Sequence, residues 1–176
     1  MGVLTFNATQ ANAAEARTAG MRLTEYQAKA AFILNFANFV EWPPKVFTGP
    51  SAPIVIGVLG EDPFEGALEQ IIQGETVNGR TVALRRSRRV EDLKTCQVLF
   101  ISQLEEKSFP HIFDSLKGAS VLTIGDADRF AENGGIICLI KQENRIRFQI
   151  NIQAAASAGL KISSKLLQLA QIIGPA

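Results

Sequence analysis

The chain has 176 residues, of which 47% are hydrophobic and 20% are charged, and this composition excludes an intrinsically disordered protein because it can bury a core. Its 18 lysines and arginines nearly balance its 17 aspartates and glutamates, which excludes a general electrostatic attraction to nucleic acid or to an anionic membrane. The longest uncharged apolar run, residues 30–40, is too short to cross a bilayer, so we predict no transmembrane segment.

The first twenty residues are mostly small and polar and show no helical or strand periodicity. We predict that residues 1–20 are a disordered tail outside the fold. Residues 11–13 have the Ala-x-Ala form that signal peptidase requires, so the tail is either the remnant of a secretory signal or an alanine-rich terminus. The preceding apolar stretch, residues 3–6, is short for a signal peptide, and the residues alone leave both interpretations open.

A helix is predicted from Thr24, because Thr24 and Gln27 have the spacing of a capping box, and Pro43 ends it by excluding helical geometry from the preceding residue. Aromatic side chains on one face of this helix and just beyond it offer more apolar area than a single face needs. Part of this set is a candidate surface for self-association into a homodimer, while complete burial in the core fits the periodicity equally well. The set comprises Phe32, Phe36, Phe39 and Trp42.

Apolar runs and helical segments then alternate along the chain. Asp62 and Pro63 are a predicted N-cap and first helical residue, and Asn78-Gly79 is a predicted tight turn. The alternation predicts an α/β fold: a three-layer sandwich with a mostly parallel sheet of about six strands and a C-terminal antiparallel hairpin, in one domain of residues 21–176. The expected strands are residues 54–59, 81–85, 97–102, 120–124, 136–140 and 146–150, and the later helices are residues 63–72, 109–117, 151–158 and 163–173.

No motif has the residue spacing of a catalytic or metal site. The segment 57–60 lacks the glycine spacing and the lysine of a phosphate-binding loop, and His111, the single histidine, has no companion nucleophile or ligand. Asp126 and Asp128 follow the fourth expected strand and, with Asp62, are candidates for a hydrolase, although a capped turn is the simpler explanation. We therefore predict no catalytic residue, no metal and no cofactor.

Two further features have structural explanations. Cys96 and Cys138 are predicted to be free buried thiols, because the strands that carry them are not expected to be neighbours. The basic run of residues 85–89 is predicted to protect a solvated strand edge, or else to contact an acidic patch on a protein. It lacks the interleaved aromatic residues of a nucleic-acid site, so we predict no nucleic-acid partner.

The C-terminal hairpin and the segment after it form the predicted binding surface. Arg147 lies on a strand that alternates cationic with apolar residues, and the last helix begins near Ser163 and Ser164 with free N–H groups that favour an anion. Polar donors from two segments are thus expected to converge on one carboxylate of a ligand or partner, and a capped helix beside a solvated strand is the structural alternative. The predicted residues are Arg147, Asn151, Lys161, Ser163 and Ser164.

Several stretches of the chain are specific through their combined order and spacing. They are EYQAKAAFILNFANFVEWP at 25–43, IGVLGEDPF at 56–64, VNGR at 77–80, CQVLFIS at 96–102, GGII at 134–137, RIRFQIN at 145–151 and AGLKISSKLL at 158–167. Together they resemble the YfiR family of small bacterial periplasmic proteins, and the resemblance extends over residues 21–173.

This resemblance implies a periplasmic α/β protein without enzymatic activity. It implies a regulator that binds the periplasmic domain of an inner-membrane diguanylate cyclase and lowers cyclic-di-GMP signalling, or that serves a sensor kinase in the same way. It also favours a signal-peptide remnant at residues 1–13. Having only two cysteines, the chain departs from the disulfide-stabilised members, so the resemblance implies no redox role. Two other functions stay open: a periplasmic small-molecule binding module, and a hydrolase that uses Asp126 and Asp128.

Overall fold

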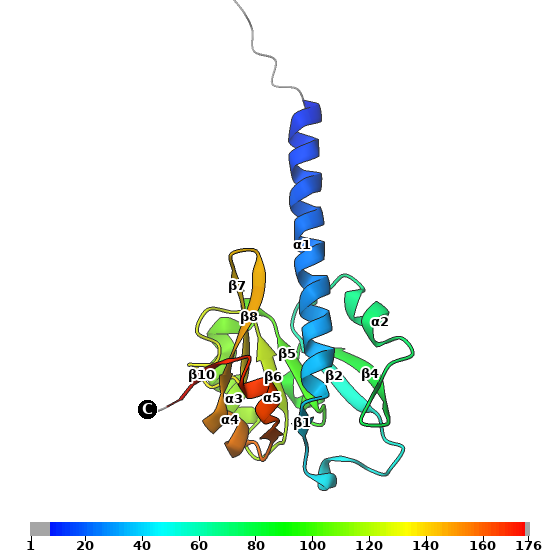
Figure 1. Ribbon diagram of the computed structural model, residues 1–176, viewed down its shortest axis with the longest axis vertical. Coiled ribbons are helices and arrows are strands. Elements are labelled where there is room, and N and C mark those ends of the chain that lie inside the picture. The colour runs from blue at the N-terminus through cyan, green and yellow to red at the C-terminus, as the bar shows by residue number, and fades with distance from the viewer. Residues whose placement is uncertain (1–7, 175–176) are drawn as a thin grey trace, which may run out of the picture.

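The computed structural model describes residues 8–174 as a layered α/β body from which one long helix projects (Figure 1). This helix, α1, spans Ala8–Ala37, so it begins well before the predicted start and occupies residues 8–20, where a disordered tail was expected. Thr24 does not cap it; its hydroxyl donates to the carbonyl of Gly20 at 3.0 Å, inside the helix. Alanine recurs through this segment without proline, which lets the helix propagate back from its packed half. Residues 1–7 lie outside the described part.

Eight strands form one sheet in the order β10-β8-β7-β6-β5-β2-β4-β3. Strands β4, β2, β5, β6 and β7 are parallel, in the doubly wound order 2-1-3-4-5 when they are counted along the chain. Strand β8 is antiparallel to β7, which confirms the predicted mostly parallel sheet with its C-terminal hairpin. The bounds are β2 Ile54–Leu59, β3 Thr76–Val77, β4 Arg80–Ser87, β5 Val98–Ile101, β6 Leu122–Gly125, β7 Ile137–Gln142, β8 Arg145–Asn151 and β10 Gln171–Ile173.

Two hydrophobic cores, one on each face of the sheet, make the predicted three layers. Along β5, Val98 and Phe100 point into the core beneath α1, whereas Leu99 and Ile101 point into the core beneath α3. Strands covered on both faces carry continuous apolar runs, which is the pattern of this sequence. The first layer holds α1, α2 (Ala67–Ile72), α4 (Ile152–Ser157) and α5 (Ser164–Leu167), and the second holds η2 (Val90–Leu93) and α3 (Phe109–Ser115), with η3 (Gln103–Ser108) leading into α3.

Tight turns follow the residue types that each turn requires. Asn78 and Gly79 both have positive φ and join β3 to β4, as a two-residue hairpin turn demands. Glu143 and Asn144 also have positive φ and join β7 to β8, so the loop between these strands is shorter than predicted. Asp62 does not start a helix; its carboxylate accepts from the backbone N–H of Phe64 at 2.8 Å, and α2 begins later, after Gly66.

The C-terminal segment differs most from the prediction. Residues 163–173 do not form one helix: α5 is a single turn, and β10 then pairs in parallel with β8. Without β10, strand β8 would leave a row of backbone groups unpaired at the sheet edge. A separate antiparallel pair joins β1 (Val40–Glu41) to β9 (Lys161–Ile162), and η1 (Pro44–Val46) follows β1. None of the helices in residues 8–174 is both long and apolar enough to span a membrane.

Candidate functional site

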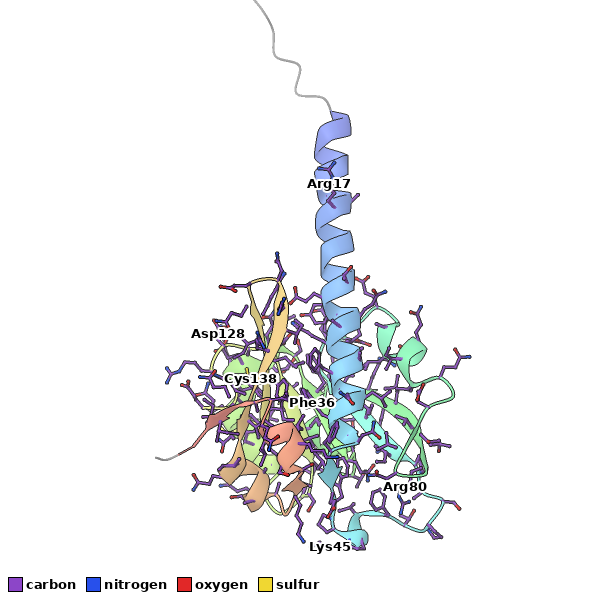
Figure 2. All side chains as sticks on the ribbon, in the orientation of Figure 1. Arg17, Phe36, Lys45, Arg80, Asp128 and Cys138 are labelled. Carbon is purple, nitrogen blue, oxygen red and sulfur yellow. The ribbon has the colours of Figure 1, made fainter. Side chains whose placement is uncertain are left out.

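A cleft of about 530 Å³ opens at the carboxyl ends of the parallel strands, between α1 and the β7–β8 hairpin. Ligands of open α/β sheets bind at this edge of the sheet. Figure 2 shows Asp128 and Cys138, two residues of the cleft, on the hairpin side of the molecule. Its polar lining includes residues of α1 (Glu25, Tyr26, Lys29), of the loop after β6 (Asp126, Asp128, Arg129) and of the hairpin (Lys141).

The innermost wall of this cleft is a buried ion pair between Lys29 and Asp126. The Lys29 ammonium lies 2.8 Å from Asp126 Oδ2, and the two side chains are 5% and 3% exposed. The same ammonium lies 2.9 Å from a carboxylate oxygen of Glu25, one helical turn earlier on α1. The Tyr26 hydroxyl donates to Asp126 Oδ2 at 2.9 Å. Helix α1 therefore supplies two side chains, Tyr26 and Lys29, that hold a single carboxylate from the sheet edge, and Glu25 in turn holds Lys29.

Close packing of the loop after β6 fixes the position of Asp126. Strand β6 ends at Gly125, and the ring of Phe130 lies so close that a Cβ at Gly125 would meet it at 2.6 Å. A Cβ at Gly135 would meet the same ring at 2.1 Å. The loop therefore folds around Phe130, which is fully buried, and turns Asp126 toward α1.

The charges in this cluster stabilise one another. Burial disfavours the charged ammonium of Lys29, but its bonds to Asp126 and Glu25 hold its pKa above the ordinary value. Burial likewise opposes ionisation of Glu25, yet Lys29 and Lys141 keep its pKa below the ordinary value. Burial together with the Asp126 charge raises the pKa of Tyr26 to about 12, so the phenol stays a proton donor. At neutral pH the cluster thus holds an ammonium, a phenol and paired carboxylates.

One oxygen of the cluster lacks a partner. Asp126 Oδ1 is buried, and within residues 8–174 it is the side-chain polar atom recorded as buried without a hydrogen bond. Buried carboxylate oxygens are normally bonded, because leaving one unpaired costs about 1–3 kcal/mol. Asp126 therefore retains an unused hydrogen-bond acceptor beside the cleft.

Asp126 and Asp128 both line the cleft, but the three carboxylates considered for a hydrolase differ in their surroundings. Asp128 is exposed, and Asp62 lies elsewhere, with its carboxylate 2.6 Å from Arg86. Cys138 reaches the cleft, but burial raises the pKa of its thiol, which donates to the carbonyl of Ala127 at 3.4 Å. In the described part of the chain no three His, Cys, Asp or Glu side chains group as metal ligands do.

The structure places Arg147 and Lys161, the two cations of the predicted binding surface, on different sides of the sheet. Arg147 alternates on β8 with Ile146 and Phe148, which point toward α1, so it lies on the opposite face. Lys161 lies in β9, whose neighbouring residues pack in the α1 layer. The other three residues lie at helix starts. Asn151 accepts from the N–H of Ala154 and donates to the carbonyl of Ala131. Ser163 accepts from the N–H of Lys165, and Ser164 is the first residue of α5.

The aromatic set divides into core and surface. Phe36 is 1% exposed and Trp42 is 8% exposed, and the Trp42 indole donates to the carbonyl of Gln97 at 3.0 Å, so neither is available to a second copy of the chain. Phe32 and Phe39 are half-buried, and Phe32 borders a shallow groove between α1 and α2. Self-association through this groove stays a prediction. Cys96 and Cys138 are both buried free thiols.

Sequence reasoning missed Glu25, Tyr26 and Lys29 as site residues. A signal was present, because Lys29 has the helical spacing of Ile33 and Phe36, which are core residues. A lysine on the apolar face of a helix needs a buried carboxylate, and Asp126 was already a candidate residue.

Comparison with known proteins gives one family match and two similar structures. A model of the YfiR/HmsC-like family matches residues 26–171. A structure described as the ABC domain in complex with L-Trp, from Streptococcus pneumoniae, has a TM-score of 0.50 at 15% identity, covering 68% of this chain and 55% of that one. A conserved domain protein from Vibrio cholerae has a TM-score of 0.49 at 14% identity, covering 68% and 54%. The chain spans about half the length of these two structures, and the first of them shows a shared fold alone.

Proposed function

The chain belongs to the YfiR/HmsC-like family, whose members are periplasmic regulators, and we propose that it is a regulator that acts without catalysis. It binds the periplasmic domain of an inner-membrane diguanylate cyclase and thereby lowers cyclic-di-GMP signalling. The family match over residues 26–171 carries this proposal. The cleft described above, which we call the carboxyl-edge cleft, supports it, because Tyr26 and Lys29 both bind Asp126 there and none of the three is a nucleophile with an adjacent base.

The rim of the carboxyl-edge cleft is the surface that we assign to the partner. Asp128 and Arg129 are exposed on the loop after β6, and Lys141 stands opposite on β7, 3.1 Å from Glu25. Exposed charges of both signs around a rigid floor determine which partner binds and in which orientation, and they add less to the affinity. The buried ion pair of Lys29 and Asp126 forms the rigid floor of the cleft.

The test is binding to purified periplasmic domains of membrane diguanylate cyclases and sensor kinases from the source bacterium, one at a time. We expect one cyclase domain to bind and expression of the chain to lower cellular cyclic-di-GMP. The double variant Asp128→Arg with Arg129→Glu reverses both rim charges and should weaken binding about tenfold or more. Lys107→Glu, an exposed position outside the cleft, is the control. Unchanged cyclic-di-GMP upon expression of the chain, or binding of none of these domains, would refute the proposal.

A second candidate function, binding of a small molecule in the same cleft, rests on the unpaired Asp126 Oδ1. A ligand with an N–H or O–H donor would complete the hydrogen bonds of this carboxylate. Thermal unfolding in the presence of small amines and polyols tests it, with Asp126→Asn as the variant that alters the acceptor. If no compound raises the melting temperature of the wild-type chain, this second function is excluded.

A further inference from the structure

A second cleft, of about 570 Å³, lies at the amino-terminal edge of the parallel strands, opposite the site described above. Three loops form most of it: residues 45–53 before β2, residues 94–97 before β5 and residues 118–120 before β6, and Val55 of β2 and Arg85 of β4 complete it. Figure 2 shows this separation, with Lys45 at one end of the body and Asp128 toward the other. The two clefts therefore share no lining residue.

All the formal charges that line this amino-edge cleft are positive. Lys45, Arg85 and Lys94 line it, and none of its lining residues is a carboxylate. All three are exposed, and none takes part in an ion pair recorded within residues 8–174. The adjacent Arg86 differs, because it is bound by Asp62 at 2.6 Å and by Glu69 at 2.5 Å. Arg85 donates to the Thr95 hydroxyl at 3.1 Å, which leaves its positive charge without a carboxylate partner and holds it at the cleft.

The wall of the amino-edge cleft is apolar and held in place. Val46, Phe47 and Pro53 belong to it, and Val55 lies beside them. The Arg80 guanidinium stacks 3.8 Å above the Phe47 ring and donates to the carbonyls of Gly49 at 2.9 Å and Ala52 at 2.8 Å. This contact ties the loop of residues 47–53 to β4, so the wall is formed before any ligand arrives.

A buried amide adds a donor to the same cleft. Gln97 is 4% exposed, and its carbonyl oxygen accepts from the backbone N–H of Val55 at 2.8 Å. Its amide nitrogen makes only long contacts, 3.5 Å to the carbonyl of Val46 and 3.4 Å to the carbonyl of Thr95. Hydrogen bonds of this length are weak, so the amide N–H groups remain able to bond a ligand oxygen.

We propose that the amino-edge cleft binds a small organic anion, a carboxylate with an apolar body. The cations and the Gln97 amide suit the carboxylate, and the apolar wall suits the body of the molecule. Its volume lies in the range of small-molecule sites, which are mostly apolar with a few placed polar groups. This site is independent of the proposed partner surface, because it lies at the other edge of the sheet.

The test uses 2-naphthoate as the anionic probe and 2-naphthylmethanol as its neutral counterpart, each titrated calorimetrically into the full chain. We expect naphthoate to bind at least tenfold more tightly than the alcohol. The double variant Arg85→Glu with Lys94→Glu should weaken naphthoate binding at least tenfold, because two attractive charges become repulsive. The matched control, Arg88→Glu with Arg89→Glu, makes the same change in charge outside the cleft and should alter binding less than twofold.

A second measurement does not depend on any variant. Raising the salt concentration should weaken naphthoate binding to the wild-type chain and leave the alcohol unaffected, because salt screens exposed charges. Equal binding of the two probes, or equal effects of the two double variants, would overturn the proposal. Binding of a hexaglutamate peptide without binding of naphthoate would overturn it in favour of an acidic protein partner. None of these readouts involves the cyclase, so failure here leaves the proposed function standing.

Discussion

Replacing Lys29 by methionine tests whether the buried charge cluster organises the carboxyl-edge cleft. Methionine retains most of the aliphatic stem and removes the ammonium, which lies 2.8 Å from Asp126 and 2.9 Å from Glu25. Asp126 then keeps only the Tyr26 hydroxyl as a partner in a site where its side chain is 3% exposed. The variant therefore leaves an uncompensated charge in the interior.

The magnitude follows from this burial. Breaking a buried ion pair by removing one partner costs about 3–5 kcal/mol, and here solvent screens neither side chain. A domain of this size loses about 2–4 °C of melting temperature per kcal/mol, so we expect a fall of about 6–20 °C. Thermal and urea unfolding followed by circular dichroism measure it. The control is Lys117→Met, which breaks the exposed pair of Lys117 and Asp114 and should leave the melting temperature unchanged.

A double variant distinguishes a lost ion pair from a general packing defect. In Lys29→Met with Asp126→Leu, no charge of the pair remains, and replacing a buried pair by apolar residues is often neutral. We expect this double variant to be more stable than Lys29→Met alone. If Lys29→Met destabilises the chain no more than Lys117→Met does, or if Asp126→Leu adds to its loss, the assignment of a buried ion pair is wrong.

Three further predictions concern the same fold. The chain has a single tyrosine, so its tyrosinate absorbance should titrate near pH 12 in the folded state. The free energy of unfolding should fall above pH 10, because the unfolded phenol loses its proton before the folded one does. Tyr26→Phe should remove this fall with pH, and a folded-state titration near pH 10 would contradict the prediction. Phe36→Ala should cost about 3–5 kcal/mol of unfolding free energy, more than Phe32→Ala, because only Phe36 is fully buried. In a pull-down with the cyclase domain, Arg147→Glu should weaken a complex that includes the hairpin surface, and Lys161→Glu should not. Equal weakening by the two variants would mean that both residues belong to one binding surface, as the sequence predicted.

Local patterns in the sequence were sufficient for the layers of the fold. The apolar runs of β2 and β5 indicated strands covered on both faces, and Asn78-Gly79 indicated the hairpin turn that the structure contains. Asp126 was also a candidate from sequence, because it follows a strand at the edge where ligands bind, but as a hydrolase carboxylate and not as the partner of a buried lysine. These features depend on neighbours within a few residues, and a short window of sequence contains that information.

The tertiary structure alone decided the features that depend on distant partners. Lys29 and Asp126 are 97 residues apart, and no local pattern states that α1 crosses the sheet where β6 ends. The last residues have the apolar spacing of a helix, yet Gln171–Ile173 became a strand because β8 offered unpaired backbone groups at the sheet edge. The same holds for the amino-edge cleft, since its cations come from three separate places in the chain: Lys45 before β2, Arg85 in β4 and Lys94 before β5. Local preference is worth tenths of a kcal/mol per residue, whereas an unpaired buried charge or an open strand edge is worth several, so the distant partner prevails.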